Sequence, residues 1–224
     1  MSTQPIVIFG AGGFGREVLQ LIHDINRANP AATVWEPLGF VVDAAYVDDR
    51  LVNGLPIVGS PDWLVTHPEV RIVLAVGAPA VRRRTVASWT SISPDRYATL
   101  VHPRAWVGDH VGIGHGSVIC AGALITTNIT IGQHVHVNIG CTIGHDAVLE
   151  DFVTLNPSVN ISGNVRLGTG VDVGTRAALI PHADVGEWSI LGAGTVATKA
   201  LPANVTAVGS PAKVIKERAP GWHG

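Results

Sequence analysis

The sequence predicts a small α/β domain followed by an all-β parallel β-helix built from hexapeptide repeats. Two patterns support this prediction. An apolar segment at residues 6–9 runs directly into a glycine-rich turn and then a helical pattern. From Val101 to Leu191, every sixth residue is Val, Ile or Leu without interruption. With 46% hydrophobic and only 14% charged residues in a chain of 224, both parts can bury a core.

The α/β part begins with a buried strand at residues 6–9, followed by the turn Gly10-Ala11-Gly12-Gly13-Phe14-Gly15. A helix comes next, because apolar residues recur on one face from Phe14 to Ile25. In this strand–turn–helix context, glycines let the backbone approach a phosphate, and the helix N-terminus favours the negative charge. The turn from Gly10 to Gly15 is therefore a candidate phosphate-binding site. The alternative is a tight turn without a ligand.

Further strands are expected near residues 35–42, 71–76 and 97–101, with Ser60-Pro61 opening a short helix. Asp43 ends the second strand, where a ribose hydroxyl can be recognised or where the carboxylate is simply solvated. This Rossmann-like domain over residues 1–97 is one half of a doubly wound fold, which disfavours NAD-dependent chemistry. The β-helix is expected over residues 98–200, and residues 201–224 are expected to cap its open end.

The repeat identifies the β-helix because a period of six matches neither a helical turn nor a hairpin. The aliphatic positions are Val101, Val107, Ile113, Ile119, Ile125, Ile131, Val137, Ile143, Leu149, Leu155, Ile161, Leu167, Val173, Leu179, Val185 and Leu191. Each hexapeptide supplies one short strand and one corner, and three of them close a triangular coil. Residues 18 apart in the sequence therefore stack in columns.

Composition excludes several classes of function. The formal net charge of −2 gives no basic surface for nucleic acid. We expect neither a signal peptide nor a membrane span, because no long apolar run occurs. Of the two cysteines, Cys141 falls on an inward position and Cys120 on an outward one, so they are not expected to pair. This usage fits a reduced, cytoplasmic compartment.

His145 is the strongest candidate for chemistry among the ten histidines. It lies at a corner, and Gly163 occupies the same column one coil later, which leaves room beside the ring. The neighbouring column is polar throughout: His110, Asn128, Asp146, Asn164 and His182. A histidine can accept a proton from an attacking amine or hydroxyl, and Asp146 could orient the ring. The alternative is a corner histidine bonded to backbone.

Several motifs resemble those of the bacterial hexapeptide-repeat sugar acetyltransferases, namely the nucleotide-linked amino-sugar N-acetyltransferases and the sialic acid O-acetyltransferase type. The matching segments are Gly10 to Gly15, Gly39-Phe40-Val41-Val42-Asp43, Leu100-Val101-His102-Pro103, Ile143-Gly144-His145-Asp146, Asp151-Phe152, Ser162-Gly163-Asn164-Val165, Ile190-Leu191-Gly192-Ala193-Gly194 and Gly209-Ser210-Pro211-Ala212-Lys213. This resemblance implies a left-handed β-helix, although parallel crossovers are generally right-handed. It also implies acetyl-CoA as co-substrate and a cytoplasmic role in cell-surface polysaccharide biosynthesis.

The resemblance also assigns site residues. His145 is the expected general base, assisted by Asp146. The resemblance places acetyl-CoA in the groove between two subunits of a homotrimer, and the expected contacts are Gly163, Gly174, Thr175, Gly192, Ala193 and Lys213. The acceptor, a small-molecule sugar with its nucleotide, is expected at Gly10 to Phe14, Asp43, Gly77, Arg82 and Asn138. No metal is expected.

The chain departs from relatives in three segments of the sequence. Asp146 is often Glu, and some relatives carry a second histidine where this chain has Thr154. Relatives that bind uridine nucleotides often have two asparagines where this chain has Ala78-Pro79, whereas Arg82 matches an arginine and could contact phosphate. The nucleotide base is therefore left open.

The expected reaction is direct acyl transfer, with His145 deprotonating the acceptor amine or hydroxyl as it attacks the thioester. The N–H of Gly163 would stabilise the oxyanion, and Lys213 would lie near the CoA phosphates. Three alternatives stay open. The chain could acetylate a hydroxyl of a free sugar or another small molecule. It could be a non-catalytic trimeric scaffold. It could also be a metal enzyme of the γ-carbonic anhydrase type, with His110, His115 and His145 as ligands.

Overall fold

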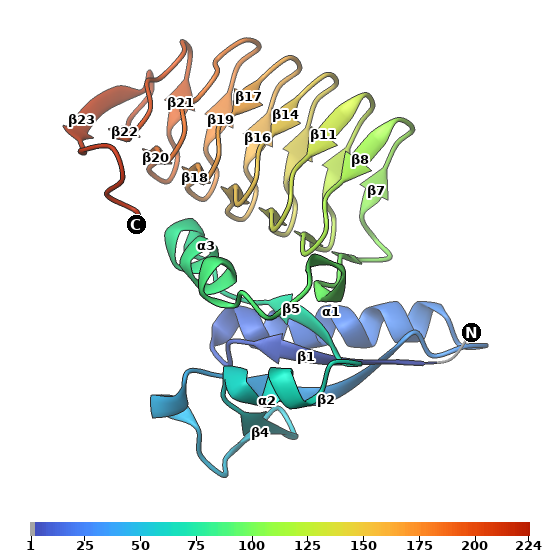
Figure 1. Ribbon diagram of the computed structural model, residues 1–224. Helices are drawn as coiled ribbons and strands as arrows, with labels where there is room; N and C mark the ends of the chain where they lie inside the picture. The colour runs from blue at the N-terminus through green and yellow to red at the C-terminus, as the bar shows by residue number, and fades with distance from the viewer. Residues whose placement is uncertain (1–2) are drawn as a thin grey trace.

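Figure 1 shows the computed structural model, which describes residues 3–224 and places the α/β domain beneath one side of a long β-helix. The domain contains a five-stranded sheet with strands β1 (Gln4–Phe9), β2 (Trp35–Val41), β3 (Leu51–Val52), β4 (Leu55–Gly59) and β5 (Arg71–Leu74). The spatial order is β3-β4-β2-β1-β5, and only β3 runs antiparallel to its neighbour. This parallel arrangement gathers the carboxyl ends of β1, β2 and β5 at one edge.

Helices cover both faces of this sheet. They are α1 (Gly13–Ala28), α2 (Pro61–Thr66) and α3 (Pro79–Ser88), with two short 3-10 turns at η1 (Ala44–Tyr46) and η2 (Pro94–Arg96). Helix α1 buries its apolar stripe, including Val18 and Ile22, against β1 and the β-helix. Helix α2 and the second half of α3 pack on the opposite face, where Leu64 and Trp89 join a second core. Ser60 takes the expected N-cap position of α2, without a side-chain capping bond.

The prediction that residues 97–101 form a strand of the domain's sheet is wrong. Tyr97 forms only an isolated bridge with Ile72. The chain then crosses to the β-helix, because the N–H of Leu100 bonds to the carbonyl of Ser117 at 3.0 Å. The hairpin of β3 and β4 was not expected, although Asn53-Gly54, with both residues at positive φ, forms its turn.

The β-helix is a triangular prism with three parallel sheets. The first sheet contains β6 (Leu100–Val101), β9 (Val118–Ile119), β12 (His136–Val137), β15 (Thr154–Leu155), β18 (Asp172–Val173), β20 (Ile190–Leu191) and, at its end, β22 (Val205–Val208) and β23 (Lys213–Glu217). The second contains β7 (Trp106–Val107), β10 (Leu124–Ile125), β13 (Thr142–Ile143), β16 (Asn160–Ile161), β19 (Ala178–Leu179) and β21 (Val196–Ala197). The third contains β8 (Val111–Ile113), β11 (Ile129–Ile131), β14 (Val148–Leu149) and β17 (Arg166–Leu167).

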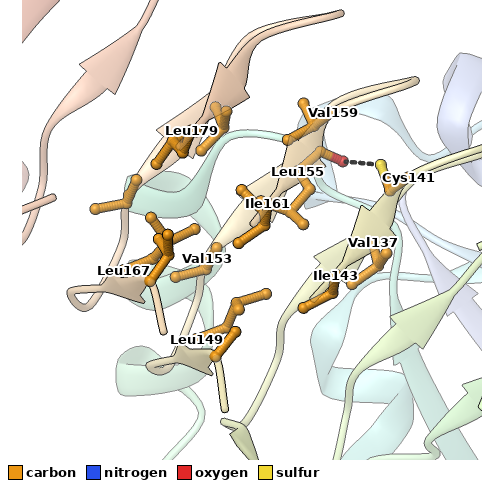
Figure 2. Close-up of a cluster of buried hydrophobic side chains, with 14 of the residues drawn as sticks. Val137, Cys141, Ile143, Leu149, Val153, Leu155, Val159, Ile161, Leu167 and Leu179 are labelled. Carbon is orange, nitrogen blue, oxygen red and sulfur yellow. Dashed lines mark hydrogen bonds between the residues drawn. The ribbon is translucent and has the colours of Figure 1, made fainter. Parts of the chain in front are cut away.

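The interior of the prism is filled by the repeat positions, as Figure 2 shows for Ile143, Leu155 and Ile161. Residues 18 apart pair across neighbouring coils, for example Ile125 with Ile143 and Ile143 with Ile161. Leu149, Leu155 and Leu167 are fully buried. The fold class expected from the sequence, an α/β domain followed by a parallel β-helix, is confirmed.

The corners of the prism explain the polar column. Every sixth residue there has positive φ: His110, Gly116, Gly122, Asn128, His134, Gly140, Asp146, Phe152, Ser158, Asn164, Gly170, Arg176, His182, Trp188 and Gly194. Gly, Asn, Asp and His tolerate this conformation better than most residues. The column from His110 to His182 is therefore polar mainly for a backbone reason, and within it the Asp146 side chain contacts the His145 ring.

The C-terminal segment covers the last coil. β22 continues the first sheet beside β20, and β23 folds back antiparallel on β22. His223 then stacks on Trp188 at 3.7 Å between ring centres, and the Arg84 guanidinium donates to the His223 carbonyl. Within residues 3–224, no helix has the length and apolar character needed to cross a membrane.

Both cysteines are free and buried, Cys141 in the interior and Cys120 between the prism and α1. Burial raises the pKa of the Cys120 thiol to about 12 and that of Cys141 to about 11. These raised pKa values disfavour a thiolate near neutral pH, and they therefore disfavour either cysteine as a nucleophile.

Arg82 joins the two parts of the chain. Its side chain is fully buried, and its guanidinium donates hydrogen bonds to the carbonyls of His134 and Phe152 and to the Thr154 hydroxyl. It also donates to the carbonyls of Val76 and Gly77 in the α/β domain. Burial lowers the pKa of Arg82 to about 9, so the group stays charged at neutral pH. The junction is therefore a buried cation bound mainly by carbonyl oxygens.

Two buried histidines make this junction sensitive to acid. Burial, with His115 and Arg82 nearby, lowers the pKa of His134 to about 3. Burial also lowers the pKa of His136. An unfolded chain binds a proton at these rings below about pH 6.5, whereas the folded chain does not. Stability should therefore fall as the pH drops from about 6.5 towards 3. Urea unfolding between pH 7.5 and pH 4.5 measures this fall.

A His134→Phe variant is the matched control for acid sensitivity. Phe152 already occupies the same column at positive φ, so the corner accepts a phenyl ring. The variant should lose stability less steeply with falling pH than the natural chain. An unchanged slope would contradict the assignment of acid sensitivity to His134.

Candidate active site

His145 projects from the corner between β13 and β14, at the edge where the second and third sheets meet; we call this the histidine edge (residues 144–147 and 162–165). The His145 side chain is 61% exposed. Its Nδ1 lies 2.7 Å from Oδ2 of Asp146. Adjacent strand residues point apart, but Asp146 has φ of 60°, which turns its carboxylate back towards the ring. The short Asp146 side chain therefore reaches the ring.

Gly163 lies directly beneath the imidazole. A Cβ at this position would lie 2.7 Å from both Nε2 and Cε1 of His145, so any side chain would displace the ring. The N–H of Asn164 bonds to the His145 carbonyl at 2.9 Å and fixes the corner. Within the described chain, no acceptor is found for the Gly163 N–H. The glycine thus provides both the space for the ring and a free donor beside it.

This geometry suits a general base. With the proton on Nδ1, the ring donates to the Asp146 carboxylate, and Nε2 keeps its lone pair. Once Nε2 accepts a proton, the carboxylate stabilises the imidazolium. The exposed ring can approach a reacting amine or hydroxyl without rearrangement of the backbone.

The residues expected to bind acetyl-CoA divide between two edges. Gly163 shares the histidine edge, whereas Gly174, Thr175, Gly192 and Ala193 lie on the edge between the first and second sheets. Thr175 and Ala193 are exposed. A Cβ at Gly174 would lie 2.6 Å from the Ala193 nitrogen, so coil stacking alone requires this glycine. Lys213 is exposed at the start of β23, which pairs with β22.

The α/β domain does not cover the histidine edge of its own chain. It packs on the first sheet, where Phe14 contacts His136 with ring centres 5.0 Å apart. The histidine edge lies opposite that sheet in a triangular prism (Figure 1). His145 and the glycine-rich turn of one chain are therefore not brought together.

The glycine-rich turn opens onto a cavity of about 380 Å³ at the carboxyl ends of β1, β2 and β5. Of the expected residues, Gly10, Ala11, Gly12 and Asp43 line it. Gly13, Phe14, Gly77, Arg82 and Asn138 do not. Asn138 is buried at the first sheet with 9% exposure. The remaining lining residues are Phe9, Val42, Tyr46, Arg50, Val76, Val81 and Thr85.

The individual glycines of the turn have different roles. A Cβ at Gly15 would lie 1.9 Å from the Gly10 carbonyl oxygen, so the fold itself requires glycine there. At Gly12 and Gly13, nothing lies within 4 Å of an added Cβ. The first turn of α1 has neither an acidic residue nor a side-chain cap. Its N–H groups are thus available to an anion, and the space at Gly12 is available to a ligand.

The expectation that Arg82 contacts a phosphate requires correction. Its guanidinium is buried in the junction described above, where it donates hydrogen bonds to several backbone carbonyls. Sequence reasoning also missed Tyr46 and Arg50, which line the cavity from the segment after Asp43. Their position close behind a strand end was the available signal.

The residues proposed for a metal site are dispersed. Among residues 3–224, no three His, Cys, Asp or Glu side chains gather into a group that could hold a metal ion. His115 lies at the edge between the third and first sheets, with its ring 5.4 Å from that of His134. It is therefore remote from the histidine edge in the same chain.

Comparisons with known proteins agree with this architecture. Residues 5–89 match the PglD N-terminal domain family. The GDP-perosamine N-acetyltransferase of Escherichia coli O157:H7 is 30% identical over 225 residues, covering 93% of this chain and 95% of that protein.

Two solved structures are similar over nearly the whole chain. A variant of perosamine N-acetyltransferase from Caulobacter crescentus, in complex with CoA and GDP-perosamine, has a TM-score of 0.83 and 27% identity, covering 95% of this chain and 97% of that one. The acetyltransferase domain of PglB from Neisseria gonorrhoeae has a TM-score of 0.81 and 30% identity, covering 95% and 100%.

Proposed function

The chain belongs to the hexapeptide-repeat sugar acetyltransferases, and we propose that it transfers the acetyl group of acetyl-CoA to the amino group of a GDP-linked sugar. The observation that carries this proposal is the His145–Asp146 pair lying over Gly163. GDP-perosamine, on which the relative from Escherichia coli acts, is the acceptor substrate we favour. A cytoplasmic location completes the proposal, because both cysteines are free.

The proposed mechanism is a direct attack without a covalent enzyme intermediate. The sugar amine attacks the thioester carbon while His145 Nε2 accepts its proton. The Gly163 N–H stabilises the oxyanion, a contribution on the order of 3 kcal/mol when well aimed. The C–S bond then breaks, and the imidazolium returns the proton to the leaving CoA thiolate. Asp146 holds the ring in the productive tautomer throughout.

A homotrimer would complete the site. The outward positions of the second sheet include Trp106 and Leu124, which are 55% and 47% exposed, whereas the third sheet presents Arg166. Apolar faces of this kind favour burial against copies of the same chain. If the second sheets face the threefold axis, the histidine edge of one copy meets the next copy's edge carrying Thr175 and Ala193. Acetyl-CoA would lie between them, and the next copy's α/β domain would present the sugar.

An acetyl-transfer assay tests this function. The protein is incubated with acetyl-CoA and GDP-perosamine, and both free CoA thiol and product mass are followed. Release of the CoA thiol shows that the acetyl group has been transferred. A product that is stable to hydroxylamine is an amide, whereas a product that hydroxylamine cleaves is an ester. A UDP-linked amino sugar and a free amino sugar serve as comparison acceptors. Equal turnover with the free sugar, or an ester product, would overturn the proposal of a nucleotide-linked amine.

The Gly12→Ala variant separates ligand binding from folding. Because an added methyl group meets no protein atom, the melting temperature should stay within a few degrees of that of the natural chain. The methyl group would instead occupy space needed by the nucleotide, so affinity for GDP should fall by about 10-fold or more, as measured by titration calorimetry. Gly112→Ala is the matched control, since Gly112 has equally open surroundings on the third sheet. Normal GDP affinity in Gly12→Ala would remove the turn from the binding site.

A further inference from the structure

The positive charge beside the cavity at the glycine-rich turn comes from Arg50 rather than from Arg82. A sugar diphosphate is an anion, and the arginine that the sequence suggested for it, Arg82, is buried in the junction. Among the residues that line the cavity, Arg50 is the only basic one. The helix N-terminus of α1 supplies partial charge alone. A full cationic contact to the diphosphate therefore has to come from Arg50 among these residues.

Arg50 is held in a way that leaves its binding end free. Its Nε lies 3.5 Å from Oδ1 of Asp48, and the same carboxylate oxygen accepts the Arg50 backbone N–H at 3.2 Å. The Arg50 side chain is 57% exposed. An arginine bound through Nε keeps both terminal amino groups available, and these match two phosphate oxygens in a bidentate contact.

Tyr46 lies on the same segment and faces the same cavity. It ends the 3-10 turn η1, which begins directly after Asp43, and its N–H bonds to the Asp43 carbonyl at 2.8 Å. Tyr46 is 65% exposed, so the face of its ring is open to a ligand in the cavity. A nucleotide base stacked on this ring would bury apolar surface on both partners.

We propose that the segment from Asp43 to Arg50 forms a clamp for the nucleotide, in which Tyr46 stacks on the base and Arg50 binds the diphosphate. This inference rests on the proposed function and identifies two specificity-determining residues for it. This segment and the glycine-rich turn both line the cavity, so the ligand is recognised at both its base and its phosphates.

Binding measurements on the full chain with GDP and with guanosine test the clamp. Arg50→Gln should weaken GDP binding by about 10- to 100-fold and leave guanosine binding unchanged, because only the phosphate contact is lost. Tyr46→Ala should weaken both ligands by about 10-fold, whereas Tyr46→Phe keeps the stacking surface and should bind both normally. In turnover assays, both weakened variants should raise KM for the nucleotide sugar with little change in kcat.

Arg27→Gln is the control for a general loss of positive charge, since Arg27 is 67% exposed and pairs with Asp24 at the far end of α1. It should bind GDP normally. Equal GDP affinity in Arg50→Gln and the natural chain would overturn the clamp and leave the proposed function standing. Failure of the natural chain to bind any of GDP, UDP, TDP or CMP would instead remove the nucleotide-linked acceptor substrate, and the clamp with it.

Discussion

Replacing His145 with alanine should lower turnover by roughly 100-fold or more and leave the free energy of unfolding nearly unchanged. The chemical effect is large because His145, whose ring lies beside Gly163, is the proposed general base. The effect on folding is small because the side chain is 61% exposed and its one side-chain bond is to Asp146, which is itself 49% exposed. Steady-state rates with acetyl-CoA and the nucleotide sugar, together with urea unfolding, give both quantities.

A second corner histidine supplies the control for this prediction. His182 lies on the same edge of the prism at positive φ, a conformation that asparagine also tolerates. The His182→Asn variant should keep normal turnover and stability. Turnover within a few-fold of the natural rate in His145→Ala would exclude His145 as the base.

The largest loss of stability is expected from Arg82→Ala. The substitution would deprive the carbonyl oxygens of His134 and Phe152 and the Thr154 hydroxyl oxygen of the donor that Arg82 supplies. Each buried acceptor that loses its donor costs about 1–3 kcal/mol, so a total loss of several kcal/mol is expected. Arg82→Lys should recover little of this, because a single ammonium cannot reach acceptors spread around the guanidinium plane. Urea unfolding followed by fluorescence and by circular dichroism measures the loss.

The matched control is Arg84→Ala on the same helix. Arg84 is exposed and donates to the carbonyl of His223 in the C-terminal tail, so its loss should cost under about 1 kcal/mol. Equal stability of the Arg82→Ala and Arg84→Ala variants would contradict the role assigned to the junction.

The β-helix was predictable because a single chemical rule repeats. An aliphatic residue every sixth position has only one way to be buried, so Ile143 could be assigned to the interior without coordinates. The hairpin was also predictable, because Asn53-Gly54 is a typical dipeptide of a two-residue hairpin turn. By contrast, the sequence could not show whether residues 97–101 pair with the domain's sheet or with the first coil of the β-helix. Their mostly apolar side chains can be buried in either place.

The site was predictable only in part. His145 and Gly163 were paired by their spacing, but their contact depends on the ring orientation, and the contact with Asp146 depends on its positive φ. Arg82 was misassigned because an arginine near a phosphate loop can bind either a ligand or the protein. Which of these occurs depends on the packing of α3 against β15, a long-range contact that sequence spacing does not encode.

We propose that two copies of the chain build one site, with His145 from one copy and the glycine-rich turn from the next. Co-expression of His145→Ala with Gly12→Val tests it most directly, because each variant alone should be inactive at low substrate concentration. In mixed trimers with head-to-tail contacts, about a quarter of the sites would combine an intact histidine edge with an intact cavity. Activity near that fraction of the natural rate is predicted. Activity no higher than the sum of the separate variants would contradict a shared site.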